Sequence, residues 1–147
     1  MEIDSVQFRR VDVEEILDLR YEILRAGLPR DAAHFPGDND AATVHLAAKD
    51  GAAIIACATV LMNQWQDRPA CQLRGMAVAT TWQSRGIGSR LLDQVHRVAR
   101  EAGVALLWAN ARKPATAFYK KHGWEIASEE FEIPTAGPHF KMIRKLD

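Results

Sequence analysis

The sequence predicts one mixed α/β domain covering residues 1–147, and three observations favour this fold class. Several short runs alternate apolar and polar residues at a period of two, whereas two longer stretches repeat apolar residues at helical spacing. A strand-like run, a glycine turn, a helix and a second strand-like run follow one another across residues 70–111, which is typical of a right-handed crossover. A chain of 147 residues is also long enough to fold around one hydrophobic core without disulfides.

The first 27 residues predict a strand followed by a helix. Residues 3–10 have a rough period of two, as a half-buried strand does. Residues 11–27 predict a helix, because Asp12 is a suitable N-cap with Glu15 three residues later and Gly27 can end the last turn.

A long loop and a hairpin come next. Residues 28–42 contain two prolines and a glycine, and a loop of this length in a small domain is typical of a functional or mobile segment. Residues 43–62 contain two β-rich runs on either side of Asp50-Gly51, a pair that favours a tight hairpin turn.

The second half predicts, in order, a strand, a helix, a buried strand, a short helix and two closing strands: residues 70–78, 89–103, 104–111, 113–123, 124–133 and 139–146. Pro114 is tolerated in the first turn of the short helix, and Gly123 can end it.

Composition narrows the classes of partner. Basic and acidic side chains number 19 each, so no global field attracts nucleic acid or anionic lipid. The first ten residues contain no apolar segment of signal-peptide length, and no run approaches the roughly 20 apolar residues of a membrane span. Cys57 and Cys71 lie in apolar runs, which favours buried side chains over a redox pair. We expect a cytoplasmic protein with no nucleic-acid and no membrane partner.

Two glycines open the helix that follows the strand at residues 70–78. Gly86 and Gly88 would expose the first amides of that helix, and Arg85 and Arg90 add positive charge, a combination suited to a pyrophosphate. A dinucleotide fingerprint would place a third glycine at Leu91, and the Gly-Lys-Ser/Thr of a Walker loop is absent. An ordinary strand-to-helix turn remains the alternative.

Two motifs at this separation resemble one family. The run Gln83-Ser84-Arg85-Gly86-Ile87-Gly88 is similar to the Gln/Arg-x-x-Gly-x-Gly/Ala signature of the GCN5-related N-acetyltransferases (GNAT family). The segment after it is similar to the family's Ala-x-x-Phe-Tyr-x-x-x-Gly-Phe pattern, through Ala115, Phe118, Tyr119, Gly123 and Trp124. The resemblance is strong over residues 70–131 and extends to the whole chain in element order.

The resemblance implies a fold and a ligand. The GNAT fold is a mixed, mostly antiparallel sheet of about seven strands flanked by helices, with a V-shaped splay between the fourth and fifth strands. The implied cosubstrate is acetyl-CoA, without a metal. Its binding residues would be Met76, Ala77, Val78, Gln83, Ser84, Arg85, Gly86, Ile87, Gly88, Ser89, Arg90, Asn110 and Phe118.

The implied reaction is direct attack of a primary amine, from a small molecule or a peptide, on the thioester. A backbone amide, that of Val78, would stabilise the oxyanion of the tetrahedral intermediate, and Tyr119 would protonate the departing sulfur as general acid. The alternatives are a catalytically degenerate CoA-binding regulatory module and a phosphate loop for another nucleotide.

The sequence departs from the family pattern at two positions. Arg112 stands where many members have a pantetheine-binding asparagine, and Asn110 is the nearest substitute. Leu107 stands where some members have a glutamate base. The remaining candidates for a base are His45, His139 and the cluster Glu129, Glu130 and Glu132, although each also has an ordinary structural explanation.

Clues to the acceptor point to opposite charges. Asp31, Asp38 and Asp40 in the long loop could receive a cationic amine, whereas Arg74 would suit a carboxylate. An amino acid or similar zwitterion would satisfy both, and the expected acceptor-binding residues are Arg74, His45 and His139. Four tryptophans, any of which could anchor an interface, leave a homodimer open.

Overall fold

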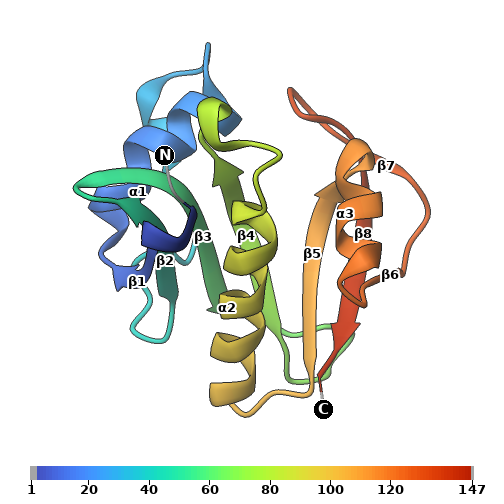
Figure 1. The fold of residues 1–147 in the computed structure, drawn as a ribbon. Helices are drawn as coiled ribbons and strands as arrows, with labels where there is room; N and C mark the ends of the chain where they lie inside the picture. The colour runs from blue at the N-terminus through green and yellow to red at the C-terminus, as the bar shows by residue number, and fades with distance from the viewer. Residues whose placement is uncertain (1–2, 147) are drawn as a thin grey trace.

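A single mixed sheet runs through the computed structural model, which describes residues 3–146 (Figure 1). The strand order is β1-β2-β3-β4-β5-β8-β6, with β7 also paired to β8. The strands are β1 (Gln7–Val11), β2 (Val44–Asp50), β3 (Ala53–Met62), β4 (Cys71–Val78), β5 (Leu106–Arg112), β6 (Glu125–Ile126), β7 (Phe131–Ile133) and β8 (Gly137–Lys145).

The mostly antiparallel sheet is confirmed, because β4 and β5 form the one parallel pair within residues 3–146. Eight strands replace the seven expected, since the strand predicted over residues 124–133 divides into β6 and β7. The first strand begins at Gln7 rather than residue 3, because Ile3–Ser5 form a 3₁₀ turn.

Three α-helices flank the sheet: α1 (Val13–Arg20), α2 (Ile87–Glu101) and α3 (Thr116–Lys121). The predicted N-cap of α1 is confirmed, since the Asp12 backbone N–H donates to Glu15 Oε2 at 3.0 Å. Tyr21–Arg25 continue this helix as a π-helical turn, and Arg30–Ala33 form a 3₁₀ turn inside the long loop. No described helix is long and apolar enough to cross a membrane.

Residues alternate along β2 and β3 between two cores, one on each face of the sheet. Leu46 and Ala58 pack with α2 in the larger core, whereas Ala47 and Cys57 pack with α1 in the smaller one. In Figure 1, α2 crosses the face of the sheet nearest the viewer. The central strands are therefore covered on both faces, which is why they read as continuous apolar runs.

The burial of the cysteines and of the tryptophans tests two expectations from the sequence. Cys57 and Cys71 are both buried and unpaired, which confirms the buried interpretation. All four tryptophans are also buried, so none is an exposed interface anchor of the kind the sequence left open; they are Trp65, Trp82, Trp108 and Trp124.

The sheet opens between β4 and β5. Their pairing covers only Cys71 to Leu73 on β4, opposite Leu107 to Ala109 on β5. Immediately beyond this, Ala58 of β3 lies opposite two residues of β4, Gly75 and Met76, a bulge in which Gly75 has a φ of +62°. A bulge bends its strand, so it accounts for β4 turning away from β5 at this point, and the two strands diverge in Figure 1. The predicted splay between the fourth and fifth strands is thus present.

Candidate active site

A cavity of about 580 Å³ lies where β4 and β5 separate. Its walls come from the turn after α1, the long loop, β4, β5, the start of α3, and the segment between β7 and β8. The lining residues include Arg25, Phe35, Pro36, Arg74, Gly75, Met76, Asn110, Arg112, Tyr119 and His139. Segments that lie far apart in the sequence therefore meet at one cavity.

The turn between β4 and α2 presents the start of a helix. Gly86, at a φ of +85°, is the N-cap of α2, and Ser84 also has a positive φ of +64°. The helix begins at Ile87, two residues before the predicted start. The first amides of an α-helix have no partner within the helix and attract anions, so this turn can bind a phosphate group.

Side chains of this turn hold it against the rest of the molecule. Gln83 Nε2 donates to the Val78 carbonyl at 3.0 Å, which ties the turn to the end of β4. The Arg85 guanidinium lies 5.4 Å from the centre of the Trp82 ring. Arg90 pairs with Asp4 at 3.2 Å, an exposed contact worth little to stability.

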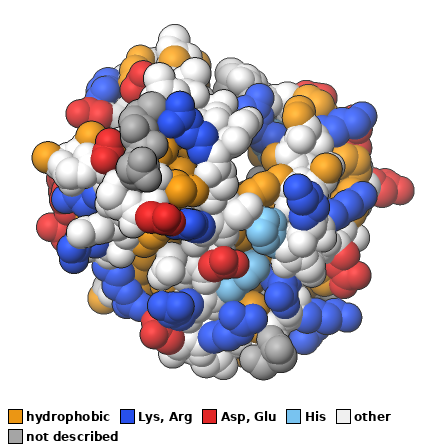
Figure 2. Space-filling model, viewed as in Figure 1, with side chains coloured by type: hydrophobic (Ala, Val, Ile, Leu, Met, Phe, Trp, Pro, Cys, Tyr) orange, Lys and Arg blue, Asp and Glu red, His pale blue; other side chains and the backbone are white. Residues whose placement is uncertain are grey.

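Met76, Gly88 and Phe118, three of the residues that the resemblance implies for cofactor binding, meet beside the cavity. A Cβ on Gly88 would lie 3.5 Å from the Phe118 ring and 3.8 Å from Met76 Cε, so the bare backbone of Gly88 lets these side chains approach α2. Nearby, Ser89 Oγ and His122 Nε2 are 3.1 Å apart and connect α2 to α3. Figure 2 shows histidine atoms between the two halves of this face, with lysines and arginines on both sides.

The end of β4 has a free side toward the opening. The Ala79 N–H donates back to Ile55 of β3 at 2.8 Å. Successive backbone amides of a strand point in opposite directions, so the N–H of Val78 is directed away from β3. An extended ligand arm could bind along this side of β4, and the Val78 amide could donate to an oxygen placed there.

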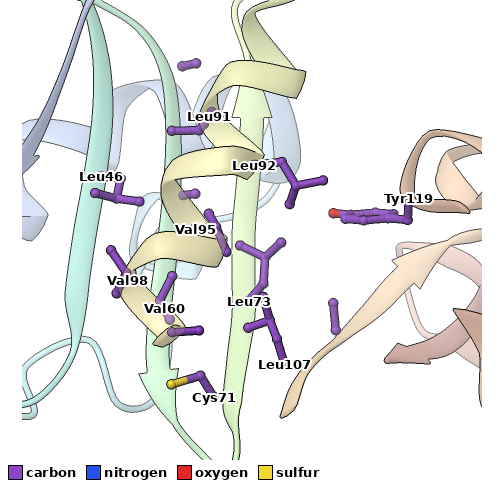
Figure 3. Close-up of a cluster of buried hydrophobic side chains, with 14 of the residues drawn as sticks. Leu46, Val60, Cys71, Leu73, Leu91, Leu92, Val95, Val98, Leu107 and Tyr119 are labelled. Carbon is purple, nitrogen blue, oxygen red and sulfur yellow. The ribbon is translucent and has the colours of Figure 1, made fainter. Parts of the chain in front are cut away.

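Tyr119 is buried at the junction of α2, α3 and β4. Figure 3 shows its ring reaching from α3 with the hydroxyl end toward Leu92 of α2. The hydroxyl lies 4.0 Å from Met76 Sδ, a distance at which the contact is weak. Burial raises the pKa of Tyr119 to about 12, so the phenol is protonated at neutral pH and can donate its proton.

His139 lies in the cavity wall at the start of β8, opposite Arg112 of β5. Its Nδ1 is 2.8 Å from the Gly137 carbonyl oxygen. A carbonyl only accepts, so Nδ1 carries a hydrogen, and in the neutral ring Nε2 is left as the acceptor. Arg74 and Asn110 also line the cavity.

The structure places other sequence candidates away from the cavity. His45 is buried, with Nδ1 2.8 Å from Thr59 Oγ1 and Nε2 2.9 Å from the Asp38 carbonyl, so both ring nitrogens serve an internal network. Asp38 binds the fully buried Arg20 through two contacts, of 2.7 and 3.2 Å, and is not open to a cationic amine. The glutamates 129, 130 and 132 do not line the cavity, and Glu130 pairs with Lys113 at 2.8 Å.

Sequence reasoning missed Arg25 and Phe35, which form part of the cavity wall. Arg25 follows α1 in a position that looks like an ordinary solvated helix face, and Phe35 lies in an irregular loop. The length of that loop was the one available signal. No group of three or more His, Cys, Asp or Glu side chains that could hold a metal ion occurs within residues 3–146.

Comparisons with known proteins agree with this geometry. The model of the acetyltransferase (GNAT) family matches residues 10–124. The uncharacterized N-acetyltransferase YitI of Bacillus subtilis (strain 168) is 27% identical over 144 residues, which cover 96% of this chain and 97% of YitI.

Solved structures share the fold at low sequence identity. Escherichia coli ElaA superposes with a TM-score of 0.81 at 15% identity, covering 95% of this chain and 99% of ElaA. A GNAT family acetyltransferase from Elizabethkingia anophelis with acetyl-CoA bound superposes with a TM-score of 0.71 at 18% identity, covering 97% and 99%.

Proposed function

Because the chain belongs to the acetyltransferase (GNAT) family, we propose that it transfers the acetyl group of acetyl-CoA to a primary amine of a small molecule or peptide. The observation that carries this proposal is the proximity of three features to Met76, a residue of the cavity wall. These are the start of α2, the free side of β4 at Val78, and the Tyr119 side chain.

The residues present suit acetyl-CoA in size and chemistry. The amides of residues 85–89 and the charge of Arg85 would hold the pyrophosphate. Met76, Ala77 and Val78 offer a strand edge to an extended pantetheine arm, and Phe118 packs beside it. Bound there, acetyl-CoA would supply an activated acetyl group and a thiol leaving group.

Each step of the transfer has a candidate residue. His139 Nε2 would accept a proton from the attacking amine, because Nδ1 is already committed to Gly137. The Val78 N–H would donate to the carbonyl oxygen and stabilise the negative charge that develops there. Tyr119 would donate a proton to the leaving sulfur, which its raised pKa keeps available at neutral pH.

Calorimetric titration tests the ligand. Acetyl-CoA is expected to bind with micromolar affinity and to be displaced by CoA but not by ATP or NAD. A preference for ATP or NAD, or no binding of acetyl-CoA, would refute the proposal. Tight CoA binding without thiol release across a broad amine panel would instead identify a catalytically degenerate CoA-binding module.

Replacing Tyr119 with phenylalanine tests the general acid. Tyr119→Phe should lower kcat about 100-fold or more, as loss of a general acid does, and should leave acetyl-CoA affinity within about twofold because the ring is kept. The matched control is Tyr21→Phe, which removes a hydroxyl bonded to the Leu28 carbonyl at 2.7 Å, outside the cavity. An unchanged kcat in Tyr119→Phe would remove this residue from the mechanism.

A further inference from the structure

The walls of the cavity carry positive charge without negative charge. Arg25, Arg74 and Arg112 line it together with His139, and no aspartate or glutamate within residues 3–146 does so. A cavity built for a polyamine or an aminoglycoside would be expected to offer carboxylates. The electrostatics of this cavity therefore favour an anionic group on whatever molecule enters it.

Arg25 and Arg74 both line the cavity and both contact the Phe35-Pro36 segment. Arg74 Nη1 donates to the Pro36 carbonyl at 2.8 Å. The Arg25 guanidinium stacks 4.7 Å from the centre of the Phe35 ring. These contacts fix one part of each guanidinium and leave further N–H donors for a ligand, since an arginine has five.

A second guanidinium on the Phe35 ring, that of Arg20, has a counter-ion that Arg25 and Arg74 lack. Arg20 stacks 4.0 Å from the Phe35 centre on the buried side, and Asp38 neutralises its charge. Neither Arg25 nor Arg74 forms an ion pair with a carboxylate in the part of the chain that the structure describes. Burial and the charge of Arg20 lower the pKa of Arg25, and burial lowers that of Arg74 although Asp38 opposes the shift. Both charges are partly desolvated, and neither is in direct contact with a carboxylate of the described residues.

We propose that the acceptor is an amine carrying a carboxylate, of the amino acid type, and that Arg25 and Arg74 bind this carboxylate. The planar fork of a guanidinium matches the two oxygens of a carboxylate. The bound anion would supply the counter-charge that the wall lacks and leave the amine to face the interior of the cavity. This inference rests on the proposed function, because it names the acceptor class of the same site.

An equilibrium measurement tests the carboxylate site without turnover. Free protein and protein saturated with acetyl-CoA are titrated with glutarate, and with glutaramide as the uncharged control. Glutarate is expected to bind in the millimolar range and glutaramide at least tenfold more weakly. Arg25→Gln and Arg74→Gln should each weaken glutarate binding at least tenfold, whereas Arg9→Gln, an exposed β1 variant outside the cavity, should not. Equal binding of the two probes, or no glutarate binding, would overturn the inference.

A kinetic measurement compares amino acids with their carboxamides as acceptors, alongside polyamines, aminoglycosides and peptides. We expect the best acceptor to carry a carboxylate, its amide to lose at least tenfold in kcat/KM, and Arg74→Gln to abolish that preference mainly through KM. A best acceptor without an anionic group would overturn the inference while leaving the acetyltransferase proposal intact. Failure of acetyl-CoA to bind would instead refute the proposed function, and the glutarate titration would still decide the carboxylate site.

Discussion

Each face of the sheet buries one polar cluster, and the two clusters differ in charge. On the α1 face, Arg20 is fully buried and bonds Asp38, the Ala33 carbonyl and Thr59 Oγ1, each with a contact of 2.7 to 2.9 Å. On the α2 face, Trp124 Nε1 donates to His96 Nε2 at 3.0 Å. The first cluster is an ion pair, whereas the second is a hydrogen bond between neutral rings.

The two clusters support opposite sides of the cavity. The Arg20 cluster fixes the long loop, so it holds Phe35 and the bulge at Gly75 in the cavity wall. The His96 bond joins α2 to the chain after α3, the two helices that flank the proposed cofactor site. A buried ion pair becomes destabilising when one partner is removed, because the other charge is left buried. A neutral imidazole acceptor loses its hydrogen bond when acid protonates it. The two sides of the cavity should therefore fail under different perturbations.

Removal of the Asp38 carboxylate should give the largest effect. Asp38→Ala leaves the Arg20 charge buried without a counter-ion and also removes the acceptor for the Phe35 N–H at 2.8 Å. The free energy of unfolding, measured with urea, should fall by about 3–5 kcal/mol. Asp40→Ala, an exposed neighbour in the same loop, should change it by less than about 0.5 kcal/mol. Equal effects of the two variants would show that the buried pair does not hold the loop.

Acid should weaken the other cluster. Burial, and then the charges of Arg144 and Arg100, lower the pKa of His96 to about 4. A protonated Nε2 can no longer accept from Trp124, so the folded chain disfavours the protonated ring. The unfolded chain, with a histidine pKa of about 6.5, therefore binds the proton more readily than the folded chain does. Stability from this residue is therefore complete above pH 6.5 and is lost as the pH falls from 6.5 toward 4, by about 2–3 kcal/mol.

His96→Gln separates this effect from other titrations, because its amide oxygen can accept from Trp124 but does not titrate. Urea unfolding of both proteins between pH 7 and pH 4.5 should give a shallower pH dependence for the variant. Parallel pH curves would mean that His96 does not titrate with folding.

The geometry of the turn that we propose binds the cofactor could be predicted from the sequence, because the turn is contiguous. Gln83 to Gly88 carry their geometry in local signals, since a left-handed N-cap at Gly86 and a bare backbone at Gly88 require glycine. Tyr119 lies in a second local motif, and the topology of a crossover brings the two together. The mostly antiparallel sheet and the splay followed from the same resemblance.

Only part of the proposed acceptor side could be predicted, because the cavity wall is assembled from distant segments. Arg74 and His139 were expected from the sequence and line the cavity, whereas Arg25 and Phe35 were not expected. Arg25 and Phe35 lie ten residues apart in sequence, yet the wall they form also depends on Arg74 from β4. Asp38 looked like a solvated turn residue, and only the folded structure pairs it with Arg20. His45 likewise looked available for catalysis, because only the folded structure shows that both of its ring nitrogens are hydrogen-bonded internally. A charge that is buried by tertiary packing has no signature in local sequence.

Alanine substitutions at two glycines should give the smallest difference in stability. The two variants compare how readily the side chains beside each glycine can shift. Gly75 and Gly123 both have positive φ, +62° and +87°, so alanine is strained by about 1 kcal/mol at either position. A Cβ at Gly75 would meet the Phe35 ring at 2.9 Å and Arg20 Nε at 3.1 Å, both held by the buried ion-pair cluster. A Cβ at Gly123 would meet Arg144 Nε at 2.8 Å. This side chain is only partly buried and is held by a hydrogen bond from Nε to the His122 carbonyl at 2.9 Å, not by a buried ion pair.

Gly75→Ala should therefore lower the free energy of unfolding by about 2 kcal/mol and Gly123→Ala by about 1 kcal/mol, as urea unfolding at pH 7 would measure. Gly75→Ala should also raise the KM for the acceptor, because Phe35 and the arginines beside it must shift, whereas Gly123→Ala should not. If the two variants lost equal stability, the Phe35 wall would be as adaptable as the partly buried Arg144 side chain, and a preorganised carboxylate site there would lose its support.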